Sequence, residues 1–303
     1  METLRRFLKI LFVRLAIYQP YVKLRQSFRF AEYEFRGTNQ QTYTIEEVSV
    51  SFNTDDPYSR AWFFPRYANG AIHEKTASRL LVYALRRSRV FIDVGANLGW
   101  FSCLAGKCMP DGEIYSFEMD DQNLALLKAN ISLNRCDNIE PFHMAVTSSD
   151  GFTNYQRAAR LPSTNFAIEV NETQTPRFEI VKVRTTSLDS FCINRQILPD
   201  LVKIDVEGAE MMVLRGMKSL LTHDHLKLLL EIHPTYLPRF GSHAVEIISY
   251  LQRFDFKIYQ IEDSRGQSDR LQLLQLTHGN ELMENCMVYA TKHNLLESDF
   301  HAS

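Results

Sequence analysis

The sequence predicts an α/β protein with a doubly wound, mostly parallel sheet, because apolar strands and helices alternate from residue 89 onward. Three apolar strands in this part each end in an acidic residue, at Asp93, Glu118 and Asp205. The first of them continues into a glycine-containing turn, Gly95-Ala-Asn-Leu-Gly99, and then into a helix. This arrangement is how α/β folds hold adenosine-containing ligands at the carboxyl edge of the sheet.

The region that precedes these strands is less regular. The apolar positions of residues 4–15 form one helical stripe opposite basic residues, which predicts an amphipathic helix. Residues 43–52 alternate apolar and polar side chains, so we expect a half-exposed strand there, followed by a turn at 53–57 and a loop at 56–58. Residues 58–67 are rich in aromatic side chains, and their pattern favours neither a helix nor a strand. A helix is expected over residues 72–85, with Glu74 near its start.

The alternating part of the chain is interrupted by an insertion. Before it, the pattern predicts strands at 89–94, 113–118 and 139–146 and helices at 98–108 and 121–134. In residues 147–186, two short strands flank a polar loop of the kind that shapes substrate pockets. After it, the pattern predicts strands at 201–205, 226–232, 257–261 and 286–291 and helices at 209–221 and 243–254. No helix separates the last two strands, so we expect an antiparallel hairpin at the sheet edge.

The composition argues against several classes of protein. The 303 residues carry a net charge of −2, so no basic field indicates nucleic-acid binding. The five cysteines are scattered, and no C-x-x-C pair or Cys/His cluster indicates a metal, so we expect no metal site. They are typical of reduced thiols in a cytoplasmic protein.

The expected N-terminal helix has three interpretations. Its continuous apolar run, residues 10–13, is far shorter than the ~20 residues of a membrane span. We therefore expect the helix to pack on the rest of the chain or on a second copy of it. Peripheral contact with a membrane surface is the second interpretation, and a signal anchor is the third.

The turn after the first strand indicates which nucleoside cofactor binds. A dinucleotide fingerprint reads G-x-G-x-x-G, whereas this chain has Asn97 at the middle glycine. Asp93 would repel a pyrophosphate but suits the cationic amino-acid end of S-adenosylmethionine. Glu118 ends the next strand, where a carboxylate binds ribose hydroxyls. The sequence thus predicts S-adenosylmethionine rather than NAD, and the alternative is a strand–turn–helix with no ligand.

A second acidic group follows the strand that ends at Asp205. Asp205 and Glu207 lie where this strand gives way to a helix, at the ligand-binding edge of the sheet. Glu210 is explained by the favourable field of a helix first turn. His233 follows the next strand, which we expect to be a neighbour. Asp205, Glu207 and His233 are therefore the candidate general bases, and Glu207 is favoured because it has no ribose or helix-dipole role.

These motifs resemble the FkbM family of S-adenosylmethionine-dependent methyltransferases. The resemblance covers roughly residues 72–292 and is carried by Asp93-Val-Gly-Ala-Asn-Leu-Gly99, Ser116-Phe-Glu118, Asn130, Asn134, Ala145-Val146, Thr186-Ser-Leu-Asp189 and Lys203-Ile-Asp-Val-Glu-Gly-Ala-Glu210. It implies a class I methyltransferase (Rossmann-like) fold with an antiparallel edge hairpin. The cofactor-binding residues that it implies are Glu74, Asp93, Gly95, Ala96, Asn97, Gly99, Glu118, Ala145 and Asp205. Met119-Asp-Asp departs from the prolines usual in the family and affects the path of that loop.

The resemblance also implies a function and a domain division. The expected activity is methyl transfer, most often to a hydroxyl oxygen of a small molecule, sugar or lipid. The expected segments are an extension at 1–70, the methyltransferase domain at 71–293 and a polar tail at 294–303. Two other classes remain open. One is a nucleic-acid methyltransferase, disfavoured by the near-neutral charge and the missing Pro-Pro-Tyr and Pro-Cys signatures; the other is a non-catalytic cofactor-binding or membrane-scaffold protein.

Overall fold

The computed structural model describes residues 39–56, 59, 66–67, 71–72, 74–158, 178–262, 271–277 and 282–295. The chain divides into two units, Met1–Gln41 with Asn53–Ile72 and Thr42–Phe52 with His73–Ser303. The expected helix at 4–15, the loop from 161 to 176 and most of residues 58–67 lie outside the described residues. The observed units differ from the expected division near residue 70, because residues 42–52 belong with the second unit.

Turn hydrogen bonds are found in the described part of the first unit. The amide of Thr54 donates to the carbonyl oxygen of Asn39 at 3.0 Å. The amide of Ser59 donates to Asp56 Oδ1 at 2.8 Å, as in a turn that an aspartate side chain closes.

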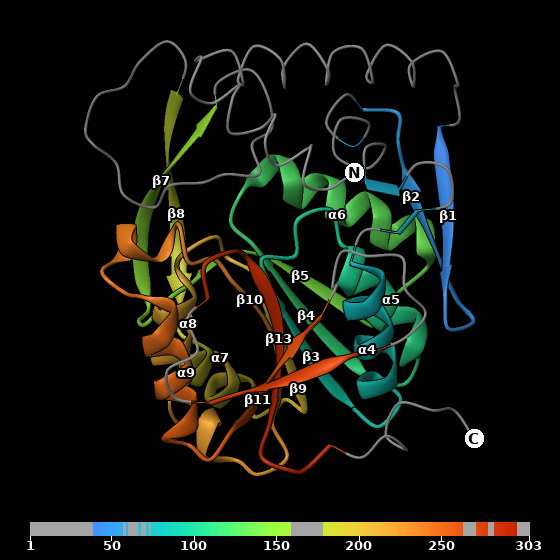
Figure 1. Cartoon of the computed structure of the whole chain (residues 1–303). Coiled ribbons are helices and arrows are strands. Elements are labelled where there is room, and N and C mark those ends of the chain that lie inside the picture. Colours follow the sequence, from blue (N-terminus) through green and yellow to red (C-terminus); the bar gives the residue numbers. More distant parts are fainter. Residues whose placement is uncertain are drawn as a thin grey trace, which may run out of the picture. The chain divides into compact units, whose positions relative to one another are not determined.

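An eight-stranded sheet organises the second unit (Figure 1). Its strands are β3 (Val90–Val94), β4 (Glu113–Glu118), β5 (Ile139–His143), β9 (Leu201–Ile204), β10 (Lys227–Ile232), β11 (Lys257–Ile261), β12 (Leu273–Leu276) and β13 (Cys286–Thr291). They lie in the order β12-β11-β13-β10-β9-β3-β4-β5. The five neighbouring strands β10, β9, β3, β4 and β5 are parallel, whereas β13 runs antiparallel to both β10 and β11. The predicted doubly wound sheet with an antiparallel hairpin is confirmed, and β12 adds an edge strand that was not predicted.

Helices cover both faces of this sheet (Figure 1). One face carries α4 (Lys75–Leu85), α5 (Trp100–Cys108) and α6 (Asp121–Asn134), and the other carries α7 (Leu188–Arg195), α8 (Glu210–Arg215) and α9 (Ala244–Gln252). Alternation along β3 explains the two layers, because Ile92 and Val94 join the core of α7, α8 and α9 while Asp93 points to α5. Within the described residues, none of the helices is both long and apolar enough to span a membrane.

The bounds of the helices follow their capping residues. Asp120 caps α6 by accepting hydrogen bonds from two amides of its first turn, and Arg135 ends the helix in a left-handed conformation, as predicted for residues 121–134. Helix α7 was not predicted, although Ser187 caps it in the same way. The expected helix at 209–221 is shorter, because α8 stops before Gly216 and only a 3-10 turn, Leu220–Thr222, follows. A second 3-10 turn spans Leu237–Phe240.

A hairpin replaces the single strand expected at 43–52. It consists of β1 (Gln40–Ile45) and β2 (Val48–Asn53). Glu46 and Glu47 form its turn with φ angles of 45° and 71°, and glutamate is not a residue that predicts such a turn.

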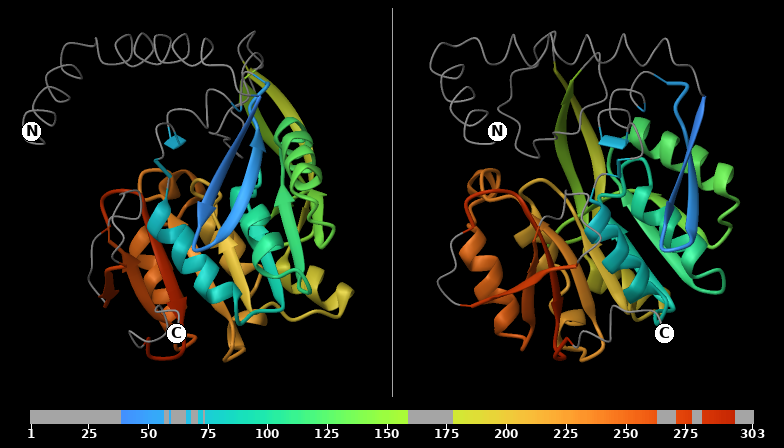
Figure 2. Two further views of the ribbon diagram at one scale, coloured as in Figure 1. Left: turned by 90° about the vertical axis from the view of Figure 1, so that its right-hand side faces the viewer. Right: turned by 45° about the vertical axis from the view of Figure 1, so that its right-hand side comes forward.

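The hairpin residues of the second unit are tied to the helical layer, as Figure 2 shows for the blue strands beside α6. Phe52 stacks on Trp100 with 5.4 Å between the ring centroids. Asn134 of α6 accepts from the amide of Ser51 at 2.8 Å and donates to its carbonyl at 2.7 Å. The hairpin therefore packs as part of the α/β unit.

A separate three-stranded sheet stands in the place of the predicted insertion. It consists of β6 (Ala145–Val146), β7 (Gly151–Ala158) and β8 (Phe178–Thr186), in the order β6-β8-β7. The strand expected at 139–146 is thus split between two sheets. Tyr155 of β7 donates to Asp120 Oδ2 at 3.1 Å, which anchors the small sheet to the start of α6.

Candidate active site

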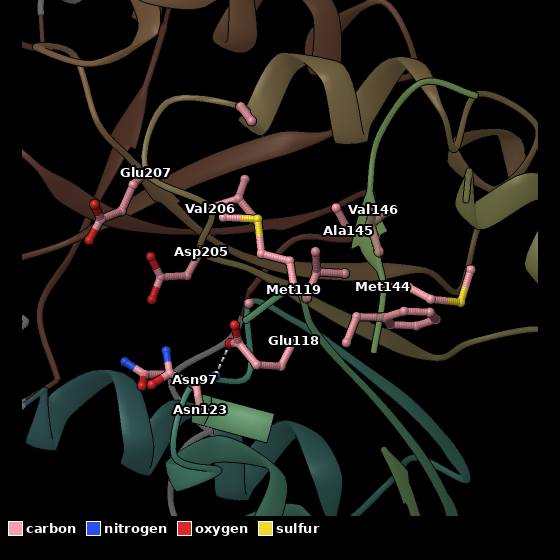
Figure 3. A pocket seen from close by; sticks show the side chains of 14 residues that line it. Asn97, Glu118, Met119, Asn123, Met144, Ala145, Val146, Asp205, Val206 and Glu207 are labelled. Atoms are coloured by element: carbon pink, nitrogen blue, oxygen red, sulfur yellow. Dashed lines mark hydrogen bonds between the residues drawn. The ribbon is translucent and has the colours of Figure 1, made fainter. Parts of the chain in front are cut away.

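A pocket opens at the carboxyl ends of β3, β4 and β9 (Figure 3). Its walls come from the turn after β3, the end of β4, the start of α6, the β6 segment and the chain that leaves β9. The lining residues are Val94, Gly95, Asn97, Phe117, Glu118, Met119, Asn123, Met144, Ala145, Val146, Asp205, Val206, Glu207 and Ala209. This is the edge at which open α/β sheets bind their ligands.

The turn after β3 brings its backbone against the segment that leaves β9. Gly95 has a φ of +77°, and a Cβ atom at this position would lie 2.0 Å from the carbonyl oxygen of Asp205. The amides of Gly95 and Ala96 both donate to Phe117 O, at 3.0 and 2.9 Å. Gly99, with a φ of +89°, starts α5. Only glycine fits the close approach at position 95 without strain.

Glu118 presents a buried carboxylate at the end of β4. Its Oε2 accepts from the amide of Asn97 and its Oε1 from the amide of Asp120, both at 2.8 Å. Burial raises the pKa of Glu118 to about 7, against the lowering effect of these two hydrogen bonds. Each carboxylate oxygen has a second lone pair, so this side chain can still accept hydrogen bonds from a ligand diol.

The wall next to Glu118 is mostly apolar. Met144, Ala145 and Val146 form one side of the pocket in Figure 3. Asn123 lies near Glu118, and its Oδ1 is buried without a hydrogen-bond partner among the described residues. Met119 lines the pocket where the resemblance placed prolines in other family members. This side of the pocket is thus mostly apolar, with Asn123 Oδ1 as an acceptor that has no hydrogen-bond partner among the described residues.

Asp93 does not lie on the pocket wall, although the sequence assigned it to the cationic end of a cofactor. It is fully buried, and its Oδ2 accepts a hydrogen bond of 2.6 Å from Ser102. Its Oδ1 lies 3.3 Å from the ammonium of Lys203, which also donates to the carbonyl of Gly95 at 2.9 Å. Burial alone would lower the pKa of Lys203, but Asp93 and Asp205 outweigh it and raise the pKa far above its usual range. Asp93 therefore contacts the turn after β3 indirectly, through Lys203.

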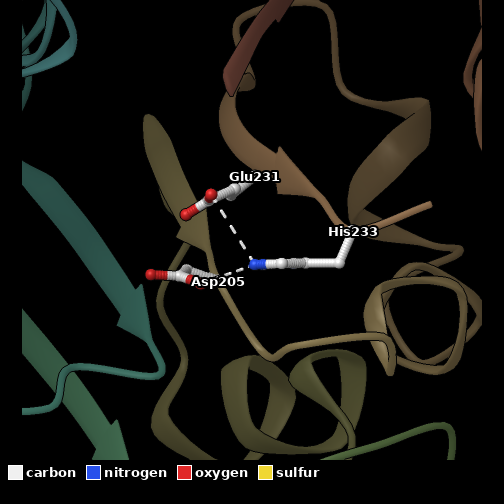
Figure 4. A group of neighbouring side chains, drawn as sticks. All are labelled: Asp205, Glu231 and His233. Atoms are coloured by element: carbon white, nitrogen blue, oxygen red, sulfur yellow. Dashed lines mark ion pairs between the residues drawn. The ribbon is translucent and has the colours of Figure 1, made fainter. Parts of the chain in front are cut away.

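A second group of charged side chains lies at the ends of β9 and β10 (Figure 4). These strands are parallel neighbours, as predicted. Lys203 pairs with Leu229, and the same register places Asp205 and Glu231 beside each other. His233 Nε2 points between the two carboxylates, 3.9 Å from Asp205 Oδ1 and 3.6 Å from Glu231 Oε1. Glu231 and His233 are buried, whereas Asp205 is 28% exposed and reaches the pocket.

Glu210 holds the other nitrogen of this histidine. His233 Nδ1 donates to Glu210 Oε1 at 2.6 Å, and the same oxygen accepts from the amide of Gly208. The sequence explained Glu210 by the helix dipole alone. Burial would lower the pKa of His233, but the bond to Glu210 and the carboxylates of Asp205 and Glu231 raise it to about 9. The carboxylates around His233 therefore favour a positive charge at the imidazole.

The remaining predicted residues lie around these two groups. Glu207 lines the pocket with a φ of +46°. Glu74 precedes α4 in a left-handed conformation, is buried, and contributes to the electrostatic field at Lys203. His233 is not on the pocket wall but behind Asp205. The pocket thus brings together Gly95, Asn97, Glu118, Ala145, Asp205 and Glu207 of the predicted residues.

Comparison with known proteins places this pocket in a family. Residues 93–258 match the family described as Methyltransferase FkbM domain. The chain belongs to the FkbM methyltransferase family. The matched segment begins at Asp93 and contains every residue that lines the pocket.

Individual relatives are distant. The hexuronic acid methyltransferase AglP of Haloferax volcanii is 25% identical over 167 residues, which cover 55% of this chain and 65% of the relative. The match thus spans slightly less than two thirds of that protein. The crystal structure of methyltransferase FkbM from Methylobacillus flagellatus is 15% identical, with a TM-score of 0.43 and coverage of 67% of this chain and 43% of that one. The O-methyltransferase TomG of Streptomyces achromogenes is 10% identical, with a TM-score of 0.38 and coverage of 71% and 79%.

Several residues of this FkbM-family site were missed from the sequence. Lys203 carried a signal, because it is a charged residue inside the apolar strand Leu201–Ile204. Glu231 carried the same signal, as a charged residue inside the apolar strand Lys227–Ile232. Asn123 lies in the first turn of an ordinary helix, where nothing local singles it out. The pairing of Glu210 with His233 joins residues 23 positions apart, which only the tertiary structure reveals.

Proposed function

We propose that this FkbM-family chain is an S-adenosylmethionine-dependent methyltransferase that acts on a hydroxyl oxygen of a sugar, lipid or other small molecule. The observation that carries the proposal is the chemical division of the pocket. Glu118, held by backbone amides, faces it from β4, while Asp205 and Glu207 face it from the segment after β9. One acid suits a ribose diol, and the others suit a cationic group and a proton transfer.

The residues present fit the proposed cofactor. The apolar side chains around Met144 suit an adenine ring, and the unused oxygen of Asn123 suits its amino group. Of the described side chains that line the pocket, none is a lysine or arginine, whereas three carboxylates, Glu118, Asp205 and Glu207, are present. This favours a sulfonium cofactor over a dinucleotide, whose pyrophosphate these carboxylates would repel.

The proposed mechanism uses the chain to orient the acceptor and to remove its proton. When bound, S-adenosylmethionine would supply a methyl group on a positively charged sulfur. Glu207 would accept the proton of the acceptor hydroxyl, and the bound cofactor would supply the methyl group that this oxygen takes up. Alignment of the three atoms by the pocket contributes much of the acceleration, and a base adds ~10²–10⁴-fold.

Geometry favours Glu207 over His233 as the base. Glu207 lines the pocket, whereas His233 lies behind Asp205 with its Nδ1 bound to Glu210 and its Nε2 facing two carboxylates. Among acceptor classes a sugar is favoured, because the relative from Haloferax volcanii is named as a hexuronic acid methyltransferase.

Calorimetry and single-turnover kinetics test the proposal. The purified chain should bind S-adenosylmethionine and S-adenosylhomocysteine but not NAD, and should transfer a labelled methyl group to a member of a panel of sugars that includes hexuronic acids. Glu207→Gln should slow transfer by ~10²–10⁴-fold with cofactor affinity unchanged. Glu284→Gln, at an exposed position far along the chain, is the matched control. A single-turnover rate within about threefold of wild type in Glu207→Gln would remove Glu207 as the base.

A further inference from the structure

The three side chains in Figure 4 have the composition and spacing of a metal-ligand set. One ligand atom each of Asp205, Glu231 and His233 lies within 4.8 Å of the others. Two atoms bound to one metal at ~2.1 Å, with angles of roughly 90–120°, are about 3.0–3.6 Å apart. The distances from His233 Nε2, 3.6 Å to Glu231 and 3.9 Å to Asp205, are at or just beyond this range. A small inward shift would complete the set.

The imidazole gives a second, independent indication. His233 is 3% exposed, and its Nε2 makes no hydrogen bond to any described residue although it points between two carboxylates. Its Nδ1 is fixed by Glu210, which is itself fully buried. A metal-ligating histidine characteristically donates its other ring nitrogen to a carboxylate in this way, which fixes the tautomer and aims the free nitrogen at the metal.

The charge of the site also calls for a cation. Three carboxylates, of Asp205, Glu231 and Glu210, surround the imidazole, and the nearby Lys203 is shared with Asp93. Asp205 faces Lys203 with Oδ2 and the imidazole with Oδ1. A divalent ion at Nε2 would offset this excess of negative charge.

We propose that Asp205, Glu231 and His233 bind a divalent metal ion beside the methyl-transfer pocket. A set of two carboxylates and one imidazole suits Mn²⁺ or Zn²⁺. The expectation of no metal site rested on the cysteine pattern and did not consider this set, whose members come from separate strands. The role of the ion rests on the proposed function. It would bind the acceptor oxygen and lower the pKa of the hydroxyl from which Glu207 takes the proton.

The route from the ion to the acceptor runs through Asp205. This side chain is the member of the set that also lines the pocket, and it is partly exposed there. An acceptor hydroxyl that enters the pocket can therefore reach the open side of the ion. Glu231 and His233 hold the ion from the buried side, so variants there should leave the cofactor half of the pocket intact.

Titration of Mn²⁺ into the full chain, followed by electron paramagnetic resonance and calorimetry, tests the site without any methyl acceptor. Wild type should bind one Mn²⁺ per chain. Glu231→Gln and His233→Asn should each weaken binding by at least about tenfold, and Glu210→Gln by about 10–100-fold through loss of the histidine orientation. Glu113→Gln and His223→Ala, both at exposed positions and at the amino-terminal ends of β4 and β10, are the matched controls and should leave Mn²⁺ affinity unchanged.

Cofactor affinity and circular dichroism of each variant show that it is folded, and they separate the two proposals. A chain that binds S-adenosylmethionine but takes up no Mn²⁺ at about 1 mM overturns the metal site and leaves the methyltransferase intact. Equal Mn²⁺ affinity in wild type and Glu231→Gln overturns it as well. Mn²⁺ uptake that depends on Glu231 and His233, in a chain that binds no cofactor, supports the site and contradicts the proposed function instead.

Discussion

Two acidic regions meet at the carboxyl edge of the sheet, and they are stabilised by different kinds of partner. Glu118 at the end of β4 is held by two backbone amides, each at 2.8 Å. Asp205 and Glu231 at the ends of β9 and β10 are held by the charged side chains of Lys203 and His233. The first carboxylate is thus held by neutral donors, and the carboxylates of the second region are held by side chains that can carry a positive charge. Residues of one type at one edge of the sheet therefore differ in their electrostatic surroundings.

Lys203 connects the two regions. Its ammonium lies 3.3 Å from Asp93 and 3.4 Å from Asp205, and it donates to the carbonyl of Gly95 in the turn. Removing this charge is the most damaging single change to either region, because it leaves Asp93 buried without its counter-charge.

Lys203→Met should therefore have the largest effect on stability. Breaking a buried ion pair by removing one partner costs about 3–5 kcal/mol, and the free energy of unfolding in urea should fall by that amount. Combining Lys203→Met with Asp93→Asn should recover part of the loss, since the second change removes the stranded charge. A loss below about 1 kcal/mol in the single variant would show that the pair stabilises neither region.

Glu118→Ala should have the next largest effect, confined to the amide-held region. Loss of charged hydrogen bonds to a ribose should cost ~1.5–3 kcal/mol and weaken S-adenosylmethionine binding on the order of 10–100-fold. Isothermal calorimetry measures this directly, with Glu284→Ala as the surface control. Unchanged affinity for S-adenosylmethionine would show that Glu118 does not bind the cofactor, and it would contradict the proposed difference between the two regions.

The pH dependence of cofactor binding should show the smallest effect. The pKa of Glu118 is about 7 in the free chain, and ribose hydroxyls favour the ionised form, so binding should strengthen as the pH rises through 7. Affinity should be about tenfold lower at pH 6 than at pH 8. Of the charged groups near Glu118, Lys203 keeps its proton over this range because its pKa is raised. Glu118→Gln should abolish the dependence, and a slope that persists in this variant would assign it to another group.

Local signals in the sequence were enough for the framework and the cofactor turn. Gly95 and Glu118 line the pocket, and both could be singled out because a turn and a strand end are defined by neighbouring residues. Helix α7 was missed because it spans only 8 residues and its cap, Ser187, resembles any loop serine. The hairpin turn at Glu46 was missed because its residue type is unusual for that conformation.

Contacts between residues far apart in the sequence could not be predicted from local patterns. Asp93 was assigned to the cofactor because it ends a strand, yet its carboxylate faces Ser102 and Lys203 instead. Glu210 was assigned to the helix dipole, yet it holds His233. In both cases an acid had a sufficient local explanation, and the partner that decides its role lies on another strand or helix.

The hairpin at residues 42–52 has a practical consequence for cloning. A truncated gene that starts at residue 71, where the methyltransferase domain was expected to begin, would omit a segment that belongs to the same unit. It would lack Phe52, which stacks on the indole of Trp100. It would also lack Ser51, whose backbone forms hydrogen bonds with the oxygen and the nitrogen of the Asn134 side-chain amide. Such a product would present an aromatic surface at the start of α5 and favour aggregation during expression. A shortened version intended for crystallisation should therefore keep both strands of the hairpin.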